Sequence, residues 1–489
     1  MRMLVMGDFS GRANRDAEDP SDLAHRKTIL VDVDNFDRVL ARMAPRLQLP
    51  IGVAGDVIAL EFNNLEDFHP DTLYRRLPPF QGLRETRLRM QDTATFNAAA
   101  AEFLSEAQRR GERSAGTVPG PRTEMQTREA DADTVARLLG SNWASSQQAA
   151  PQTAQHAVDL NALIRNIVAP HIVPDAPPHQ AQYIGAVDAA TSELMNSILH
   201  NPQFQALESL WRSVQWLVSN LEPSEQLTLY VLDVSQGELL ADIGAAQGNV
   251  ELSGLYRLLV EKAKDTTGGE PWSVIVGNYA FGLSGQDVGL LAFLGAIASH
   301  AGGPFIAAAK PEIIGCNSLA AMPEPRNWTP PQSEAVEGWH ALRASLMAPW
   351  IGLALPRMLL RRPYGKPTDR VEQFEFEELG TAREHESYLW GNGAFACALL
   401  IGRSFESRGW DMEPGDELDV DDLPAHTFDD DGEKRLQPCA EANLVERAGR
   451  AILDAGLMPL LSYKDRNAVR VMRLQSIADP SQPLSGAWG

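Results

Sequence analysis

Short apolar runs alternate with longer amphipathic segments through the second half of the chain. Such runs are typical of strands buried on both faces, and the segments between them have helical periodicity. The pattern predicts strands over residues 227–234, 272–276 and 305–309, and helices over residues 254–263 and 287–300. This order predicts a layered α/β fold with an at least partly parallel sheet.

Other segments repeat apolar positions at intervals of three and four residues. Residues 34–43 do so after Asp34, a residue type suited to capping a helix, and residues 204–218 do so around Trp211. Both faces are typical of core-packed helices, so we expect Trp211 to be enclosed. Further helices are predicted over residues 184–200, 341–348, 384–401 and 440–455, and N-terminal strands over 3–6, 28–33 and 56–62.

A polar stretch rich in Gly, Pro, Ser and Gln separates the two ends of the chain. It covers residues 108–180 and has the composition of a linker. We therefore predict a mixed α/β (α+β) chain with a small N-terminal α/β domain over 1–107, a linker with short helices over 108–180, and a larger layered α/β domain over 181–489.

The charge of the chain narrows the classes of partner. Its 489 residues include 43 Lys and Arg against 65 Asp and Glu, a formal net charge of −22. Such a chain repels phosphate, so we expect neither nucleic-acid binding nor attraction to an anionic membrane. The most apolar window, residues 288–309, is interrupted by His300 and a Gly-Gly-Pro break, so no membrane insertion is expected. The three cysteines form no CxxC pair, which fits a reducing, cytoplasmic location.

The search for catalytic and cofactor motifs assigns no residue to either role. Residues 391–396 match GxGxxA but follow a polar, helix-like segment, so we interpret them as a tight turn or helix entry. Ser284 lacks the spacing of a nucleophile elbow. His300 ends an apolar helix, and we interpret it as a hydrogen-bonded core or interface residue. No cofactor is expected.

Metal-ligand patterns are equally incomplete. Residues 384–386 (Glu-His-Glu) are not HExxH, and residues 429–433 lack the alternating ligands of a calcium loop, so no metal site is assigned. Residues 411–433 carry eleven acids and no Lys or Arg, which predicts an exposed acidic loop that could meet a basic surface. Five cations form the densest basic group, and we interpret them as salt-bridge partners for the acidic loop of a neighbouring subunit: Arg357, Arg361, Arg362, Lys366 and Arg370.

Two ordered sets of short motifs resemble one family of assembly proteins. The N-terminal part resembles the small subunit of the type VI secretion contractile sheath (VipA-, TssB- or ImpB-like) through residues 4–11 (LVMGDFSG), 26–27, 34–37, 65–71 (LEDFHPD), 79–80, 83–84 and 87. Residues 182–480 resemble the large subunit (VipB-, TssC-, ImpC- or EvpB-like) through residues 198–200, 204–208, 211–212, 304–307, 352–357, 363–365, 376–378, 388–392 and 456–460.

The resemblance implies a structural protein and not an enzyme. In that family, small and large subunits form a tight heterodimer, and heterodimers stack as helical rings around an inner protein tube. Sheath contraction drives the tube into a target cell, and a AAA+ ATPase disassembles the contracted sheath. The implied partners are other sheath subunits or copies of this chain, together with the tube protein, baseplate proteins and that ATPase.

Three departures from the family pattern leave two interpretations open. Both subunit types are represented in one chain, the large-subunit pattern stops near residues 475–478, and the part after Arg89 matches the small subunit poorly. In the first interpretation the chain is a sheath component that fuses small and large subunits. In the second, it is a non-polymerising adaptor or assembly factor of the same machine, docking on a sheath end or baseplate.

Overall fold

A computed structural model describes residues 1–51, 56–103, 164, 167–168, 180–265, 270–331, 334–380, 383–430 and 432–488. The chain divides into two compact units. The larger contains Met1–Ile51, Val57–Arg75 and Met195–Gly489, and the smaller contains Gly52–Asp56 and Arg76–Leu194. Most of the predicted linker over 108–180 lies outside the described residues, and the division into domains there stays a prediction.

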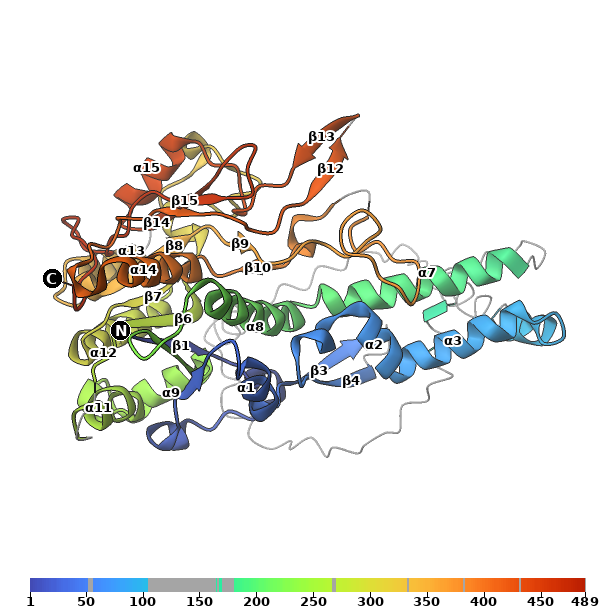
Figure 1. Cartoon of the computed structure of the whole chain (residues 1–489), viewed down its shortest axis with the longest axis horizontal. Helices are drawn as coiled ribbons and strands as arrows, with labels where there is room; N and C mark the ends of the chain where they lie inside the picture. Colours follow the sequence, from blue (N-terminus) through green and yellow to red (C-terminus); the bar gives the residue numbers. More distant parts are fainter. Residues whose placement is uncertain are drawn as a thin grey trace, which may run out of the picture. The chain divides into compact units, whose positions relative to one another are not determined.

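A nine-stranded mixed sheet forms the centre of the larger unit (Figure 1). Its order is β11-β15-β14-β8-β7-β6-β1-β5-β2, in which the six strands from β14 to β5 run parallel to one another. β2, β15 and β11 pair antiparallel near the two edges. The bounds are β1 Arg2–Gly7, β2 Ile29–Val31, β5 Thr228–Asp233, β6 Val274–Phe281, β7 Phe305–Ala309, β8 Ile351–Leu355, β11 Asp419–Val420, β14 Met458–Ser462 and β15 Val469–Val471.

The N-terminal strand β1 lies inside this sheet. Met3 aligns with Leu229 of β5 on one side and with Val274 of β6 on the other, both in parallel register. The predicted strand over 3–6 is confirmed, but its two partners come more than 220 residues later. Since β5 lies on one side of β1 and the later parallel strands on the other, the order is that of a doubly wound sheet.

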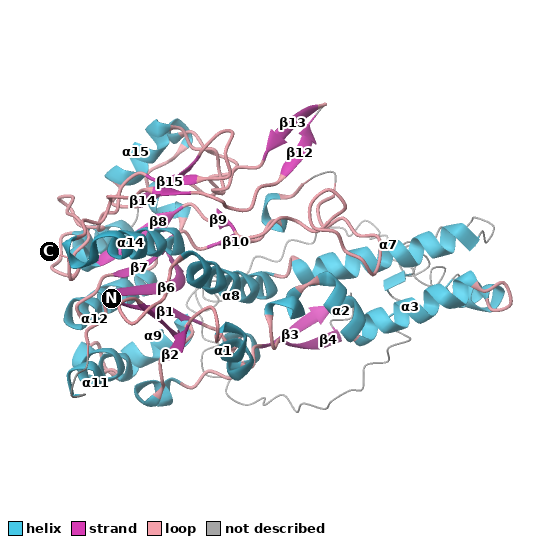
Figure 2. Cartoon of the chain, viewed as in Figure 1, coloured by secondary structure: helices cyan, strands magenta, loops and turns pink. Residues whose placement is uncertain are grey.

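Helices cover both faces of the sheet (Figure 2). α12 (Gly285–Ala301) and α14 (Ala394–Arg408) both contact β6, β7 and β8. Leu4 and Met6 join the core cluster that contains the apolar side chains of α12. Met3 faces the other side, near Gly402 of α14. This two-sided burial explains why these strands appear in the sequence as continuous apolar runs. The predicted mixed α/β class is confirmed.

The remaining elements are further helices and three two-stranded pairs. The helices are α1 Phe36–Met43, α2 Pro70–Arg76, α3 Pro78–Gln91, α7 Gln180–Leu199, α8 Pro202–Asn220, α9 Gln236–Ala245, α10 Gly254–Tyr256, α11 Lys262–Asp265, α13 Glu334–Arg343 and α15 Glu446–Asp454. Two-stranded pairs are β3 Arg46–Ile51 with β4 Asp56–Glu61, β9 Met358–Leu359 with β10 Trp390–Gly391, and β12 Thr427–Asp430 with β13 Glu433–Leu436.

Within the smaller unit, α3 and the N-terminal part of α7 are joined by polar and aromatic contacts. Arg87 Nε lies 2.7 Å from a carboxylate oxygen of Asp188, and the rings of Phe96 and Tyr183 meet edge to face. Gln180 donates to the Met90 carbonyl at 2.9 Å. The predicted helix over 184–200 is confirmed as part of α7.

Several predicted elements are wrong in place or type. The predicted helix over 384–401 is replaced in its first half by a short 3-10 turn and by β10, because Gly391 to Gly393 interrupt it, and only α14 is helical. α13 ends at Arg343, near where the helix over 341–348 was predicted to begin. α15 starts at Glu446, later than predicted. β3 was not predicted, although its burial alternates strictly.

The apolar helix α12, which ends beside His300, is packed in the core of the larger unit. His300 is exposed at the end of α12 and meets Tyr256 edge to face, so the core alternative of the prediction is wrong, and the interface alternative stays a prediction. Among the described residues, no helix combines the length and the apolar character needed to cross a lipid bilayer.

Candidate functional site

The loop after β1 joins the N-terminal part of the chain to the sheet. Gly11 has a φ of +69°, and a Cβ there would lie 2.4 Å from the Arg46 carbonyl oxygen, so only glycine fits without strain. Asp8 accepts hydrogen bonds from the backbone N–H groups of Arg12 and Ala13 at 2.7 and 3.0 Å. Burial raises the pKa of the Asp8 carboxyl. The motif over residues 7–11 is therefore a rigid turn that aims its side chains at the carboxyl ends of β1 and β5.

A buried ionic network occupies these carboxyl ends. Asp233, the last residue of β5, accepts from the Ser10 hydroxyl at 2.8 Å and from Arg12 Nη2 at 2.7 Å. Glu238 of α9 has a side chain that is 0% exposed and accepts two hydrogen bonds from Arg26, one of 2.8 Å and one of 2.5 Å. We call Ser10, Arg12, Arg26, Asp233 and Glu238 the carboxyl-end network.

The network holds Glu238 in its charged form. Burial alone would raise the pKa of its carboxyl, but hydrogen bonds from Arg26 and from the backbone N–H groups of Ser235 and Asp19 outweigh burial and lower that pKa to about 2. Ser235 and Glu238 also form a reciprocal capping box at the start of α9. No residue of this network was predicted from the sequence, although the spacing Ser-x-x-Glu directly after a buried strand was a visible signal.

Trp211 of α8 forms an aromatic contact with the N-terminal part of the chain. Its side chain is fully buried, as predicted, and its indole N–H donates to the Phe9 carbonyl at 3.0 Å. The rings of Phe9 and Phe36 meet it edge to face at centroid distances of 5.0 and 5.8 Å. The predicted apolar faces of α1 and α8 therefore pack on one another.

A second contact joins residues 65–74 to the segment around residue 370. The Asp71 carboxylate accepts from the backbone N–H groups of Glu372 and Gln373, at 3.1 and 2.9 Å. The rings of Tyr74 and Phe374 stack at a centroid distance of 4.5 Å. The LEDFHPD motif therefore also contributes to contacts between the two parts of the chain.

The densest basic group is largely matched inside the molecule. Arg361 is buried and forms ion pairs with Glu208 at 3.0 Å and with Glu378 at 2.7 Å. Arg357 pairs with Glu441 at 2.6 Å and Lys366 with Glu375 at 3.0 Å. The interpretation of this group as a surface patch for a neighbouring acidic loop is therefore wrong for these three cations. Glu441 and Glu208 lie 84 and 153 residues from their arginines, which no local pattern reveals, whereas Glu375 is only nine residues from Lys366.

The acidic segment is partly neutralised by arginines of other elements. Six of its acids form ion pairs with described residues: Asp416 with Arg408, Glu417 with Arg403, Asp419 with Arg470, Asp421 with Arg466, Asp430 with Arg383 and Arg435, and Glu433 with Arg435. Asp411, Glu413 and Asp422 are exposed and form no ion pair with any residue that the structure describes. Part of the predicted loop is also regular, since β11, β12 and the start of β13 lie within it.

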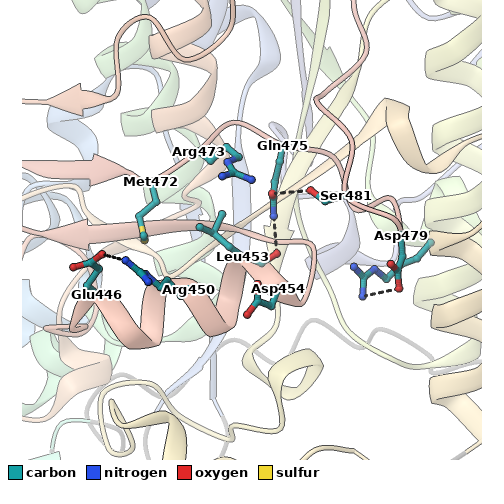
Figure 3. Close-up of a pocket in the computed structure, with 10 residues that line it drawn as sticks. Glu446, Arg450, Leu453, Asp454, Met472, Arg473, Gln475, Asp479 and Ser481 are labelled. Carbon is teal, nitrogen blue, oxygen red and sulfur yellow. Dashed lines mark hydrogen bonds and ion pairs between the residues drawn. The ribbon is translucent and has the colours of Figure 1, made fainter.

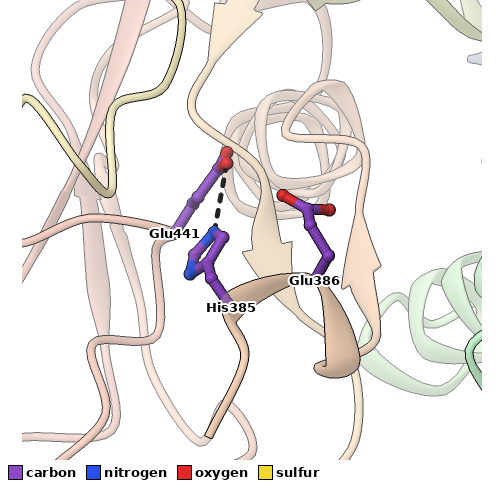
Figure 4. A group of neighbouring side chains, drawn as sticks. All are labelled: His385, Glu386 and Glu441. Atoms are coloured by element: carbon purple, nitrogen blue, oxygen red, sulfur yellow. Dashed lines mark hydrogen bonds and ion pairs between the residues drawn. The ribbon is translucent and has the colours of Figure 1, made fainter. Parts of the chain in front are cut away.

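His385, Glu386 and Glu441 form the group whose atoms come nearest to a metal-ligand arrangement (Figure 4). The His385 ring points toward the Glu441 carboxylate, with Nε2 3.3 Å from an oxygen. However, Arg357 donates to both Glu386 and Glu441, at 2.8 and 2.6 Å, and supplies the positive charge there. Burial alone would raise the pKa of Glu441, but hydrogen bonds from His385 and Arg357 lower it to about 2. Both carboxylates are therefore already engaged by Arg357 within the molecule.

A polar cavity of about 560 Å³ lies between α15 and the chain after β15 (Figure 3). Arg450 pairs with Glu446 at 2.6 Å, and Arg343 Nη1 lies 3.9 Å from Asp479. Gln475 donates to the Leu453 carbonyl at 2.8 Å. The cavity lining contains three arginines and three acids, so the cavity has no excess charge that selects a ligand class.

The other residues singled out in the sequence lie at the start of helices. Gly393 is the N-cap of α14, which confirms residues 391–396 as a helix entry. The Asn392 amide donates to the carbonyls of Gly277 and Tyr279 within β6. Ser284 is the N-cap of α12 and accepts from the Asp287 N–H. None of these three positions is part of a nucleophile–base arrangement among the described residues.

Comparison with family models identifies the class of protein. Residues 181–478 match the family described as EvpB/VC_A0108, tail sheath N-terminal domain, and residues 1–108 match the family described as type VI secretion system VipA. The first match covers more than half of the chain, so the chain belongs to the tail sheath family of type VI secretion systems.

Two curated relatives from Pseudomonas aeruginosa match different parts of the chain. The type VI secretion system sheath protein TssC1 is 36% identical over 340 residues, covering 67% of this chain and 66% of the relative. The sheath protein TssB1 is 31% identical over 112 residues, covering 21% of this chain and 65% of the relative. The chain thus spans just under two thirds of the length of each relative.

Proposed function

We propose that this chain is a non-enzymatic structural component of a type VI secretion sheath, with small- and large-subunit-like parts acting as one protomer. The observation that carries the proposal is the enclosure of β1, from the first matched region, between β5 and β6 of the second. A strand hydrogen-bonded on both sides leaves the sheet only if both ladders break. One chain then fixes a one-to-one ratio of the two parts and keeps their effective concentration high.

The ionic groups support a structural role. The buried carboxylates Asp233, Glu238, Glu208, Glu378 and Glu441 all accept hydrogen bonds from arginines. Charges neutralised in this way stabilise one arrangement of the chain and are unavailable as acids or bases for a substrate. Assembly partners would be other sheath subunits or further copies of this chain. The tube protein, baseplate proteins, disassembly ATPase and cytoplasmic location stay predictions from the resemblance.

Negative-stain electron microscopy with light scattering on the full chain tests the proposal. We expect tubules from the protein alone or after co-expression with the separate sheath subunits of its host. A discrete particle that never enters a tubule under either condition would contradict a sheath role. That outcome would instead support the non-polymerising adaptor.

A cleavable version of the chain tests the single-protomer arrangement. We would insert a protease site within residues 108–180 of the full chain, cut the folded protein, and pass it over a size-exclusion column. The two pieces should stay together, because β1 and the carboxyl-end network hold them without a covalent link. Separation of the pieces in native buffer would contradict the arrangement.

A further inference from the structure

The amino ends of β1 and β6 form a cationic pocket of about 350 Å³. Four of the residues that line it are cations, and none is an acid: Arg2, Arg26, Lys27, Thr28, Leu258, Lys262, Ala263 and Trp272. We call this the cationic pocket. The excess of positive charge is unusual for a chain with a net charge of −22, because acids outnumber cations over the rest of the molecule.

Two of these cations have no carboxylate partner in the part of the chain that the structure describes. Arg2 lies over the rings of Trp272 and Tyr230, at 4.2 and 5.1 Å from their centroids, and also donates to the Glu270 carbonyl. Neither Arg2 nor the exposed Lys27 forms an ion pair with any described residue. The Trp272 indole N–H is buried and has no hydrogen-bond acceptor among the described residues. Arg2 is thus held in place by aromatic rings, with its charge uncompensated.

The complementary charge lies at the opposite edge of the same sheet. Lys27 and Thr28 directly precede β2, one edge strand, whereas Asp411, Glu413 and Asp422 flank β11, the other. Six interstrand spacings separate β11 from β1, roughly 30 Å, so the acids of one molecule do not reach its own pocket. A contact between the two edges therefore requires two molecules.

We propose that the cationic pocket of one chain receives the acidic segment 411–422 of a second copy. The inference rests on the proposed function, since it names one contact through which protomers associate. Opposite edges of one sheet make a heterologous contact, which repeats without limit unless a ring closes. Of the seven acids in the segment, Asp416, Glu417, Asp419 and Asp421 face Arg408, Arg403, Arg470 and Arg466, so the net charge offered to the second molecule is about −3.

A charge swap between two variants of the full chain tests this contact. One variant carries Arg2→Gln and Lys27→Glu, and the other carries Asp411→Lys and Glu413→Lys. Each variant alone should associate roughly tenfold more weakly than the parent, because like charges meet at the contact. An equimolar mixture should recover, because each variant then offers the charge that the other needs. Arg362→Glu makes a similar charge change at an exposed arginine outside the pocket and should leave association unchanged.

Sedimentation velocity over a range of NaCl concentrations measures the association, and carbodiimide coupling locates it. In a mixture of ¹⁵N-labelled and unlabelled protein, we expect Lys27 of one copy to couple to Asp411, Glu413 or Asp422 of another copy. The label distinguishes these cross-links from cross-links within one molecule. Unchanged association of both variants, with tubules still formed, would overturn the pocket contact and leave the proposed function intact. Self-association with the cross-link but without tubules would contradict the proposed function and support the contact.

Two further outcomes would overturn the inference. One is a parent chain that stays monomeric at low salt and at its highest soluble concentration. The other is a thermal shift produced by inorganic phosphate and abolished by Lys27→Glu, if the same variant associates normally. That result would make the pocket a site for a small oxyanion instead of a second copy.

Discussion

The two ends of strand β1 differ in whether their arginines form ion pairs within the molecule. At the carboxyl end, Arg12 and Arg26 are bonded to Asp233 and Glu238 within the same molecule. At the amino end, Arg2 lies over aromatic rings and meets no carboxylate of the described residues. Matched charges fix the arrangement of a chain, whereas unmatched charges remain for a second molecule. We therefore assign the matched arginines a role in stability and the unmatched cations the proposed role in association between molecules.

Removing one matched charge should have the largest effect. Glu238→Ala leaves Arg26 buried without its carboxylate, so we expect the free energy of unfolding to fall by about 3–5 kcal/mol. Urea unfolding followed by circular dichroism measures the loss. If Lys27→Ala, in the cationic pocket at the amino end, lowered the free energy of unfolding by as much, the contrast between the two ends of β1 would be wrong.

The aromatic contact at the carboxyl end should be of similar strength. Trp211→Ala removes a fully buried ring that packs on Phe9 and Phe36, and we expect a loss of about 3–5 kcal/mol in the free energy of unfolding. The half-buried Trp216 on the same helix is the matched control and should cost less. A loss below about 1 kcal/mol for Trp211 would show that the ring is not enclosed in solution.

Acid should weaken the carboxyl-end network selectively. The pKa of Glu238 is about 2 in the folded chain, against an ordinary value of 4.5. A lowered folded-state pKa gives stability that is complete above about pH 4.5 and disappears as the pH falls toward 2. We expect about 1–3 kcal/mol of stability to be lost over that range through this carboxyl.

A pH series of urea unfolding curves on the parent and on Glu238→Gln checks this prediction. The variant cannot titrate at this position, so its stability should change less between pH 6 and pH 3. Identical profiles would mean that Glu238 makes no measurable contribution to acid sensitivity, and that other buried carboxylates such as Glu378 and Glu441 account for it.

Neutralising unmatched charges should barely change stability. Lys27→Gln and Glu413→Gln alter exposed groups that pair with no described residue, so we expect shifts below about 0.5 kcal/mol in the free energy of unfolding. The two variants should nevertheless weaken association and reduce its salt dependence, since exposed charges act over about 10 Å at 0.1 M salt. A large loss of stability in either variant would contradict the distinction between matched and unmatched charges.

The sequence predicted the elements whose signal is local and missed the contacts between distant segments. The apolar runs of β5, β6 and β7 and the periodic face of α8 were sufficient to place those elements. The partners of β1 could not be deduced from periodicity, because pairing across 220 residues leaves no mark near Met3. The arginines at 357 and 361 looked like an open basic group for the same reason. Their carboxylates, Glu441 and Glu208, lie far away in sequence.

The position of β1 also bears on how the protein is made. β1 leaves the ribosome before its two neighbours, which start at Thr228 and Val274. At about 5–20 residues per second, the strand waits roughly 15–55 s before both partners exist. During that time an apolar segment with two open edges is exposed to other nascent chains. Folding of the sheet is therefore completed only after most of the chain has been synthesised, and a molecular chaperone that covers residues 1–11 would raise its yield.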